Sequence, residues 1–277
     1  MASNKISKAY VDTTVLTDAL LKKYSRAEKA KAALRRFEVT ELPQYAIKEF
    51  KAGPLKNFTW LHNELAMSRS FAKVCVRLQK MSMSPRRYLT STALEALTEA
   101  ANEIRRLTAG KIVEKYGADS DIDTIQAAEY RLAVKRNVFK AWKLRRRLTT
   151  RVTDLLTCYS EIDPYESTGG LIEIDPVKCQ PKVECCLAPK LKAQPSFLRS
   201  LSYAVKSQPD SRENQRRSQA LDTLILWPRE PLTESSCRSL GDAIFVFFAP
   251  TKAVILTTNV RDHKPLASAL GKEVQQP

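Results

Sequence analysis

Near the end of the chain, an apolar stretch is bordered by two acidic residues. Residues 243–249 are too apolar for a surface helix and are followed by a proline, which predicts a short buried helix that ends there. Residues 253–256 then predict a short buried strand that runs into polar residues. In an α/β protein, helix starts and strand ends of this kind meet at one edge of the sheet. We therefore expect Asp242, before the helix, and Asp262, after the strand, to lie at that edge.

The start of the chain also combines a strand with an acid, because residues 9–16 predict a strand that contains Asp12. A carboxylate within a strand is costly unless it meets a cation or reaches the edge of the sheet. Two interpretations stay open. Asp12 either belongs to a site, where Thr13 and Thr14 orient it, or it only caps a helix that starts near Thr14.

A helix, a strand and a second helix are predicted next. Residues 25–36 have a capping serine followed by strong helix formers, and residues 37–40 predict a short strand. The helix after Pro43 carries Glu49 beside its apolar face. An acid in that position is most often an ordinary surface residue, so Glu49 gains meaning only if other acids reach the same place.

The middle of the chain has a different pattern. Residues 54–159 are predicted to be almost entirely helical, with interruptions at residues 82–85 and 117–121. Residues 160–195 are rich in Pro, Gly and Cys and show little periodicity, which predicts a long loop with room for a short strand at 171–174, and a polar segment at 207–220 follows. The expected organisation is a discontinuous α/β core from residues 1–53 and 221–277, a helical insertion at 54–159, and a loop-rich connection at 160–220.

The net charge indicates a polyanionic partner. The chain carries a formal charge of +16, with a pI near 9.6, and nucleic acid is the expected partner of such a protein. Nine basic residues and no acid lie between Arg131 and Arg151, interleaved with Phe139 and Trp142. We expect the aromatic side chains to face the core and part of the charge to contact phosphates, although such a run can also be only a solvated helix face. The residues expected to contact nucleic acid are Lys135, Arg136, Lys140, Lys143, Arg145, Arg146 and Arg147.

Several classes of protein are disfavoured. The six cysteines lack the CxxC spacing of a zinc site, two histidines make a His-dependent triad improbable, and neither a P-loop nor a GxGxxG motif is present. The apolar runs are too short to span a membrane, and the start of the chain lacks the apolar region of a signal peptide. We therefore expect a cytoplasmic protein without a membrane partner.

Taken together, the four acids resemble the acidic motifs of a known family. Asp12 lies in VDTTVL, Glu49 in PQYAIKEF, Asp242 in SLGDAIFVFFA and Asp262 in VILTTNVRDHKPLASALG. This order of an acid on a strand, two acids on helices and an acid after a strand resembles the PIN domain of VapC-type toxin ribonucleases. The resemblance covers the two ends of the chain and not the middle. It implies a PIN-like α/β/α sandwich with a short, mostly parallel sheet, plus a large mainly helical insertion.

The resemblance also implies a metal site. Asp12, Glu49, Asp242 and Asp262 would hold Mg2+ or Mn2+, because clustered carboxylates without basic partners repel one another until a hard cation binds them. Thr13 and Asn259 would support the ligands. One departure concerns the ending TTNVRD, in which either Asp262 or Asn259 could fill the fourth position.

The function implied is a Mg2+- or Mn2+-dependent ribonuclease that hydrolyses phosphodiester bonds of RNA, as the toxin of a toxin–antitoxin pair or a related defence protein. Two alternatives remain: a catalytically decayed PIN-like module that binds nucleic acid through its basic helical insertion, and a helical adaptor for an acidic protein. RNA is the expected partner, together with a cognate antitoxin if the chain is a toxin. Whether it forms a homodimer is left open.

Overall fold

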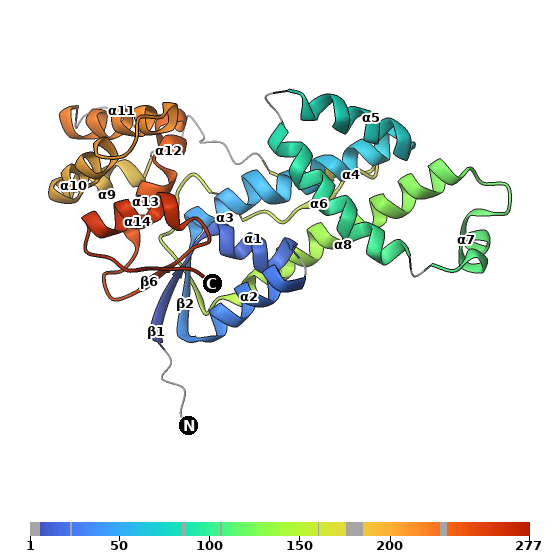
Figure 1. Ribbon diagram of the computed structural model, residues 1–277, viewed down its shortest axis with the longest axis horizontal. Coiled ribbons are helices and arrows are strands. Elements are labelled where there is room, and N and C mark those ends of the chain that lie inside the picture. The colour runs from blue at the N-terminus through green and yellow to red at the C-terminus, as the bar shows by residue number, and fades with distance from the viewer. Residues whose placement is uncertain are drawn as a thin grey trace.

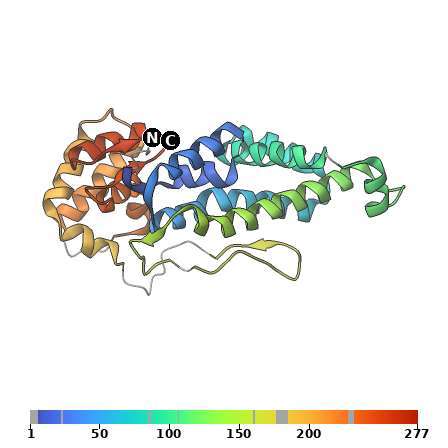
Figure 2. The ribbon, with the colours of Figure 1, turned by 90° about the horizontal axis from the view of Figure 1, so that it is seen from below.

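The protein is elongated, with a small sheet near one end and a helical arm that extends from it (Figures 1 and 2). The structure is a computed structural model. It describes residues 6–22, 24–84, 87–105, 107–159, 161–175, 185–227 and 232–277. Among these residues, no helix is both long enough and apolar enough to cross a membrane.

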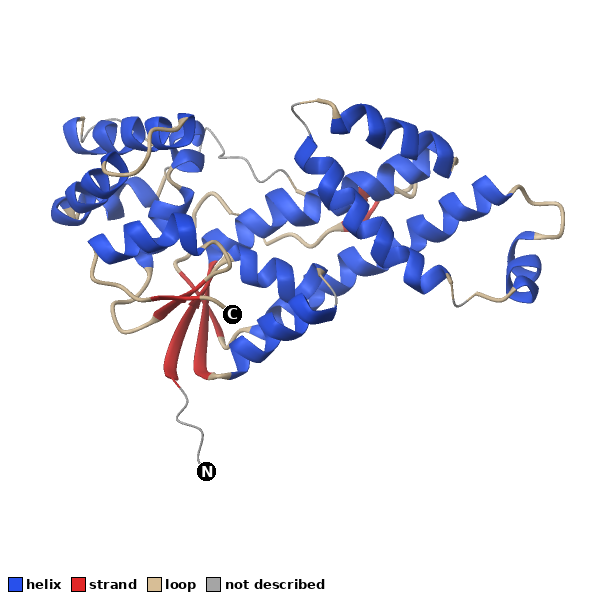
Figure 3. Cartoon of the chain, in the orientation of Figure 1, coloured by secondary structure: helices blue, strands red, loops and turns tan. Residues whose placement is uncertain are grey.

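The central sheet is parallel throughout. Its strands are β1 (Ile6–Val11), β2 (Phe37–Pro43), β3 (Arg151–Thr153), β6 (Val254–Leu256) and β7 (Val274–Gln275). Their order is β3-β2-β1-β6-β7, so the first strand lies in the middle. Figure 3 shows the strands of this sheet in red. All five strands therefore present their carboxyl ends at the same edge, where ligands bind in open α/β sheets. The predicted α/β class with a parallel sheet is confirmed.

Helices cover both faces of this sheet. From β1 the chain passes through α1 (Thr13–Leu21) and α2 (Tyr24–Arg35) to β2, and from β6 it passes through α14 (Val260–Ala269) to β7. The two crossovers move in opposite directions along the sheet, and right-handed connections then place their helices on opposite faces. The predicted buried helix is α13 (Gly241–Phe248), which packs on α14.

A buried lysine donates hydrogen bonds to the C-terminal carbonyl groups of α13. The last carbonyl groups of a helix have no partner within the helix. The side chain of Lys272 lies 2.7 Å from the carbonyl oxygen of Val246 and 2.8 Å from that of Phe247, and donates to both. Burial lowers the pKa of Lys272 to about 8. The lysine therefore replaces water as the donor at this buried helix end.

The helical arm begins at the sheet and extends away from it. From α3 (Gln44–Phe50) the chain runs through a π-helical turn at Lys51–Leu55 into α4 (Lys56–Ser68). The following helices are α5 (Phe71–Ser82), α6 (Arg87–Ile104), α7 (Ala109–Tyr116) and α8 (Ile122–Leu148). The predicted breaks are present near residue 83 and at 117–121, while residues 85 and 86 lie outside the described residues. The expected insertion at 54–159 is not separate from the core, because β3 lies within it and pairs with β2.

The expected loop-rich connection at 160–220 is wrong from residue 187 onward, where helices occupy most of the chain. The described residues 161–175 form loops and a short hairpin of β4 (Tyr165–Glu166) and β5 (Ile172–Glu173), so the strand expected at 171–174 is present. Helices follow: α9 (Leu187–Lys192), α10 (Pro195–Lys206), α11 (Arg212–Leu226) and α12 (Glu234–Ser239). Leu198, Leu201 and Val205 are buried at helical spacing, but the surrounding polar residues hide that pattern.

Candidate functional site

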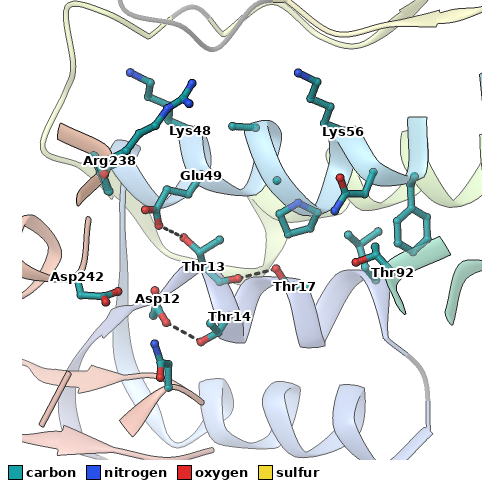
Figure 4. Close-up of a pocket in the computed structure, with 18 of the residues that line it drawn as sticks. Asp12, Thr13, Thr14, Thr17, Lys48, Glu49, Lys56, Thr92, Arg238 and Asp242 are labelled. Carbon is teal, nitrogen blue, oxygen red and sulfur yellow. Dashed lines mark hydrogen bonds between the residues drawn. The ribbon is translucent and has the colours of Figure 1, made fainter. Parts of the chain in front are cut away.

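The predicted acids meet in a cavity at the carboxyl edge of the sheet. The cavity has a volume of about 930 Å³ and is lined by residues of α1, α3, the π-helical turn, α4, α5, α6, α12, α13 and α14. In Figure 4 the carboxylates of Asp12, Glu49 and Asp242 face one another across its near end. These three residues come from segments far apart in the sequence, so the fold brings them together.

Asp12 is held at the end of β1 by hydrogen bonds from two threonines. Its backbone N–H donates to the carbonyl oxygen of Leu256 at 3.0 Å, which continues the pairing of β1 with β6. Its Oδ2 accepts from Oγ1 of Thr14 at 2.6 Å and from Oγ1 of Thr257 at 2.7 Å. Although Asp12 precedes α1, its side chain makes no cap hydrogen bond to that helix. Asp12 thus occupies the N-cap position of α1, but its carboxylate is bound by threonine hydroxyl groups and not by the N–H groups of the helix.

Glu49 is oriented by Thr13 and Gly241. The hydroxyl of Thr13 donates to Oε2 of Glu49 at 2.9 Å. A Cβ atom at position 241 would lie only 3.0 Å from Oε1 of Glu49, so the glycine leaves room for the carboxylate. Burial, followed by the negative charge of Asp12, raises the pKa of Glu49 to about 8. At neutral pH and without a cation, Glu49 therefore keeps its proton.

Asp242 has basic partners, contrary to expectation. It lies in the first turn of α13, and its Oδ2 is 2.8 Å from Nη2 of Arg217, a residue of α11 that is only 3% exposed. Nε2 of His263 lies 3.8 Å from Oδ1 of Asp242. Burial raises the pKa of Asp242, while the charges of His263 and Arg217 oppose that shift. The expectation that the acids have no basic partner is thus wrong for Asp242.

Sequence reasoning missed Arg217, although a signal was present. Along α11, Arg217 precedes the buried residues Ala220, Leu221 and Leu224 at spacings of three, four and seven residues. An arginine on the apolar face of an amphipathic helix is almost never fully buried without a partner. That position could have indicated a buried acid opposite it.

The fourth predicted acid does not line the cavity. Asn259 lines it, and Nδ2 of Asn259 donates to Oδ2 of Asp262 at 2.9 Å. Asp262 lies in the first turn of α14 and not directly after the strand. Of the two candidates for the fourth position, the structure thus places Asn259 on the cavity and Asp262 behind it.

The donor set fits a hard divalent cation at Asp12 and Glu49. As they stand, the described residues form no group of three or more His, Cys, Asp or Glu side chains that could hold a metal ion. Mg2+, however, usually binds one or two carboxylates and keeps several waters. Neither Asp12 nor Glu49 has an ion-pair partner in the described part of the chain, and the raised pKa of Glu49 marks a place where positive charge is missing. Asp242, paired with Arg217, is the less available ligand.

The basic side chains on the cavity are not those predicted from the sequence. Lys48, Lys56 and Arg238 line it (Figure 4), whereas none of the seven predicted residues does. The expectation that Arg145 contacts nucleic acid is wrong. Its side chain is 2% exposed, and its guanidinium lies 3.3 Å from the ring centroid of Trp142. The expected core position of Trp142 is confirmed.

The other six predicted basic residues lie at or near the surface of α8. Lys135 pairs with Glu166, and Arg146 lies 3.1 Å from Glu161. Of these six, the exposed ones are Arg136, Lys140, Lys143, Arg146 and Arg147. They form a basic surface outside the cavity.

The raised pKa of Glu49 predicts that metal-free protein loses stability as the pH rises from about 5 to about 8. Unfolded chains release this proton near pH 4.5, whereas the folded state holds it up to about 8. Between these values the folded state binds more protons, so the free energy of unfolding falls as the pH increases. Because the side chain borders an open cavity, we expect a loss on the order of 1–2 kcal/mol, or about 2–8 °C in Tm.

Thermal unfolding in EDTA, followed by circular dichroism at several pH values, measures this effect. Glu49→Gln is the matched control, since the amide does not titrate while Asp242 is unchanged. Equal pH slopes for the two proteins would show that Glu49 titrates normally.

Comparison of the chain with protein-family models, curated proteins and solved structures found no match. The site geometry is therefore the basis for assigning a function.

Proposed function

We propose that this protein is a Mg2+- or Mn2+-dependent ribonuclease that hydrolyses phosphodiester bonds of RNA in the cavity at the sheet edge. One observation carries the proposal: the carboxylates of the buried Asp12 and the half-buried Glu49 face the same cavity without a cationic partner among the described residues, and desolvation, followed by the charge of Asp12, raises the pKa of Glu49. The parallel sheet between layers of helices, and the order of the acidic motifs, support the resemblance to a PIN-like sandwich. On that resemblance alone we extend the proposal to a toxin with a cognate antitoxin.

Each residue of the site has a defined task in this proposal. Asp12 and Glu49 would hold the cation, and Asp242 and Asn259 would complete its surroundings. When bound, the cation activates a water molecule and neutralises charge on the attacked phosphate. Thr14 and Thr257 orient Asp12, and Thr13 orients Glu49. Because these supports are hydroxyl groups, they fix the carboxylates without neutralising them.

Positive charge on the cavity suits an anionic backbone. Lys48, Lys56 and Arg238 line the cavity, with their charged ends directed away from Asp12 and Asp242 (Figure 4). Lys48 also contacts Sγ of Cys158, and Arg238 pairs with Glu234. Phosphate contacts of this kind position a strand and carry no sequence information. The exposed basic residues of α8 add an outer surface for RNA, consistent with the net charge of +16.

Metal removal tests the proposal. We expect wild-type protein to cleave a labelled single-stranded RNA in Mg2+ or Mn2+, to lose this activity in excess EDTA, and to regain it when Mn2+ is restored. Gel analysis of the products measures cleavage. Activity that persists in EDTA would contradict a metal-dependent mechanism.

A second function, a decayed module that only binds nucleic acid, is favoured by one observation. Asp242 is already paired with Arg217, and an asparagine occupies the fourth position on the cavity. A neutral amide contributes an oxygen but no charge, so the site would hold a cation weakly. Calorimetry with Mn2+ separates the two functions: absence of metal binding together with retained RNA affinity would favour the binding module.

A further inference from the structure

The cavity continues well beyond the acids. Thr13, Thr17 and Leu21 line it at intervals of about one helical turn, and Lys22 follows at the end of α1. From Thr13 to Lys22 the helical rise corresponds to about 13 Å. The far end of the cavity is formed by the helical arm, where Trp60 of α4, Arg77 of α5 and Thr92 of α6 line it. The cavity is thus a groove that connects the site with the arm.

Small residues keep this groove open halfway along. Ala52, Gly53 and Pro54 of the π-helical turn line it opposite Thr17 of α1. A Cβ atom added at Gly53 would find nothing within 4 Å. An extended ligand that reaches the acids could therefore pass over Gly53 toward the arm.

We propose that the far half of the groove binds a nucleotide of the RNA strand, with its base on Trp60 and its phosphate at Lys56. This inference rests on the proposed function and adds a subsite to it. Lys56 and Trp60 are four residues apart on α4, so their side chains lie on the same helix face. Both line the cavity.

The charges around the groove single out Lys56 as the phosphate contact. At the far end, Arg77 pairs with the buried Glu64, and Lys22 pairs with Glu95. Lys56 is exposed and has no ion-pair partner in the described part of the chain. It is therefore the cation in this half of the groove that is available to an incoming phosphate.

Trp60 has the properties of a stacking platform. Its side chain is half-buried against the core, which fixes its orientation, and part of it borders the cavity. The described residues place no other aromatic ring or cation on its face. Bases stack on such rings without sequence preference, at about 1–3 kcal/mol per base. An acidic peptide would meet the negative charge of Asp12 at the end of the groove that holds the acids.

Binding of a labelled single-stranded RNA to the Asp12→Asn protein in Mg2+, measured by fluorescence anisotropy, tests the subsite. Trp60→Ala should weaken binding roughly 10-fold or more, and Trp60→Phe should retain most of the affinity. Trp227→Ala is the matched control, because Trp227 is 61% exposed at the end of α11 and does not line the cavity. Lys56→Gln should weaken binding and reduce its salt dependence.

A size series at position 53 tests the path of the strand. Gly53→Ala adds one methyl group to open space and should leave RNA affinity unchanged. Gly53→Trp fills the groove and should lower RNA affinity about as much as Trp60→Ala does. Unchanged RNA affinity in either Trp60→Ala or Gly53→Trp would overturn the subsite, as would displacement of the RNA by poly-glutamate as readily as by unlabelled RNA.

The outcomes separate this inference from the proposed function. If wild-type protein cleaves RNA but Trp60→Ala binds it normally, the subsite is wrong and the nuclease stands. If wild-type protein does not cleave RNA in Mn2+ but Trp60→Ala weakens binding, hydrolysis is wrong and the subsite is supported. Circular dichroism spectra of all variants establish that each one is folded.

Discussion

Replacing Asp12 by asparagine is expected to lower RNA cleavage on the order of 1,000-fold and to leave the fold intact. Oδ2 of Asp12 only accepts hydrogen bonds, from Thr14 and Thr257, and an amide oxygen can accept both. The substitution therefore removes the charge that would hold the cation and retains the contacts that hold the side chain. Initial cleavage rates in Mn2+, together with Tm, measure the two effects separately.

The same substitution at two other acids tests whether the loss of cleavage is specific to Asp12. Asp222→Asn is the matched control, because Asp222 lies on α11, pairs with Lys206 and does not line the cavity. Asp262→Asn decides the fourth position: we expect a smaller loss than for Asp12→Asn, since Asp262 reaches the site only through Asn259. Full activity of the Asp12→Asn protein would refute the nuclease, and equal losses for Asp12→Asn and Asp262→Asn would place Asp262 among the ligands.

The near end of the site could be predicted because its acids interrupt clear patterns. Asp12 and Asp242 both lie at the border of a buried element, as expected. The strand predicted at 9–16 is wrong in its second half, because β1 ends at Val11 and α1 begins at Thr13, so Asp12 follows the strand and does not lie within it. The same logic failed for Asp262. A one-residue difference in where α14 begins turns a side chain toward or away from the cavity, and element boundaries are the least certain part of a pattern.

The rest of the site depends on which helix faces meet, and periodicity does not contain that information. The pattern showed that α4 is helical but not that Lys56 and Trp60 would border a groove shared with α1. The sequence pattern also predicted nucleic-acid contacts on α8, the most basic helix, but Arg145 of that helix is buried. Charge density along a sequence reports composition, whereas a site needs charges on facing surfaces.

Replacing Arg217 by methionine is expected to destabilise the protein by about 3 kcal/mol, which corresponds to a fall in Tm of roughly 10 °C. Removal of one partner leaves the carboxylate of Asp242 partly buried without its cation. Asp242 is 25% exposed and borders the cavity, so we expect the lower end of the range for a broken buried pair. Glu213, the other acid beside Arg217, is 71% exposed and should add little.

The matched control for this change is Arg216→Met, since Arg216 is exposed on the same helix and should contribute within about 0.5 kcal/mol. The double variant Arg217→Met/Asp242→Asn should regain part of the loss, because a neutral amide needs no cation. Loss of Arg217 should also raise the pKa of Asp242 further, so the destabilisation should shrink as the pH falls and the carboxyl takes up a proton. A loss of stability that is equal at pH 5 and pH 8, or that the double variant does not reduce, would show that Arg217 acts through packing and not through the charge of Asp242.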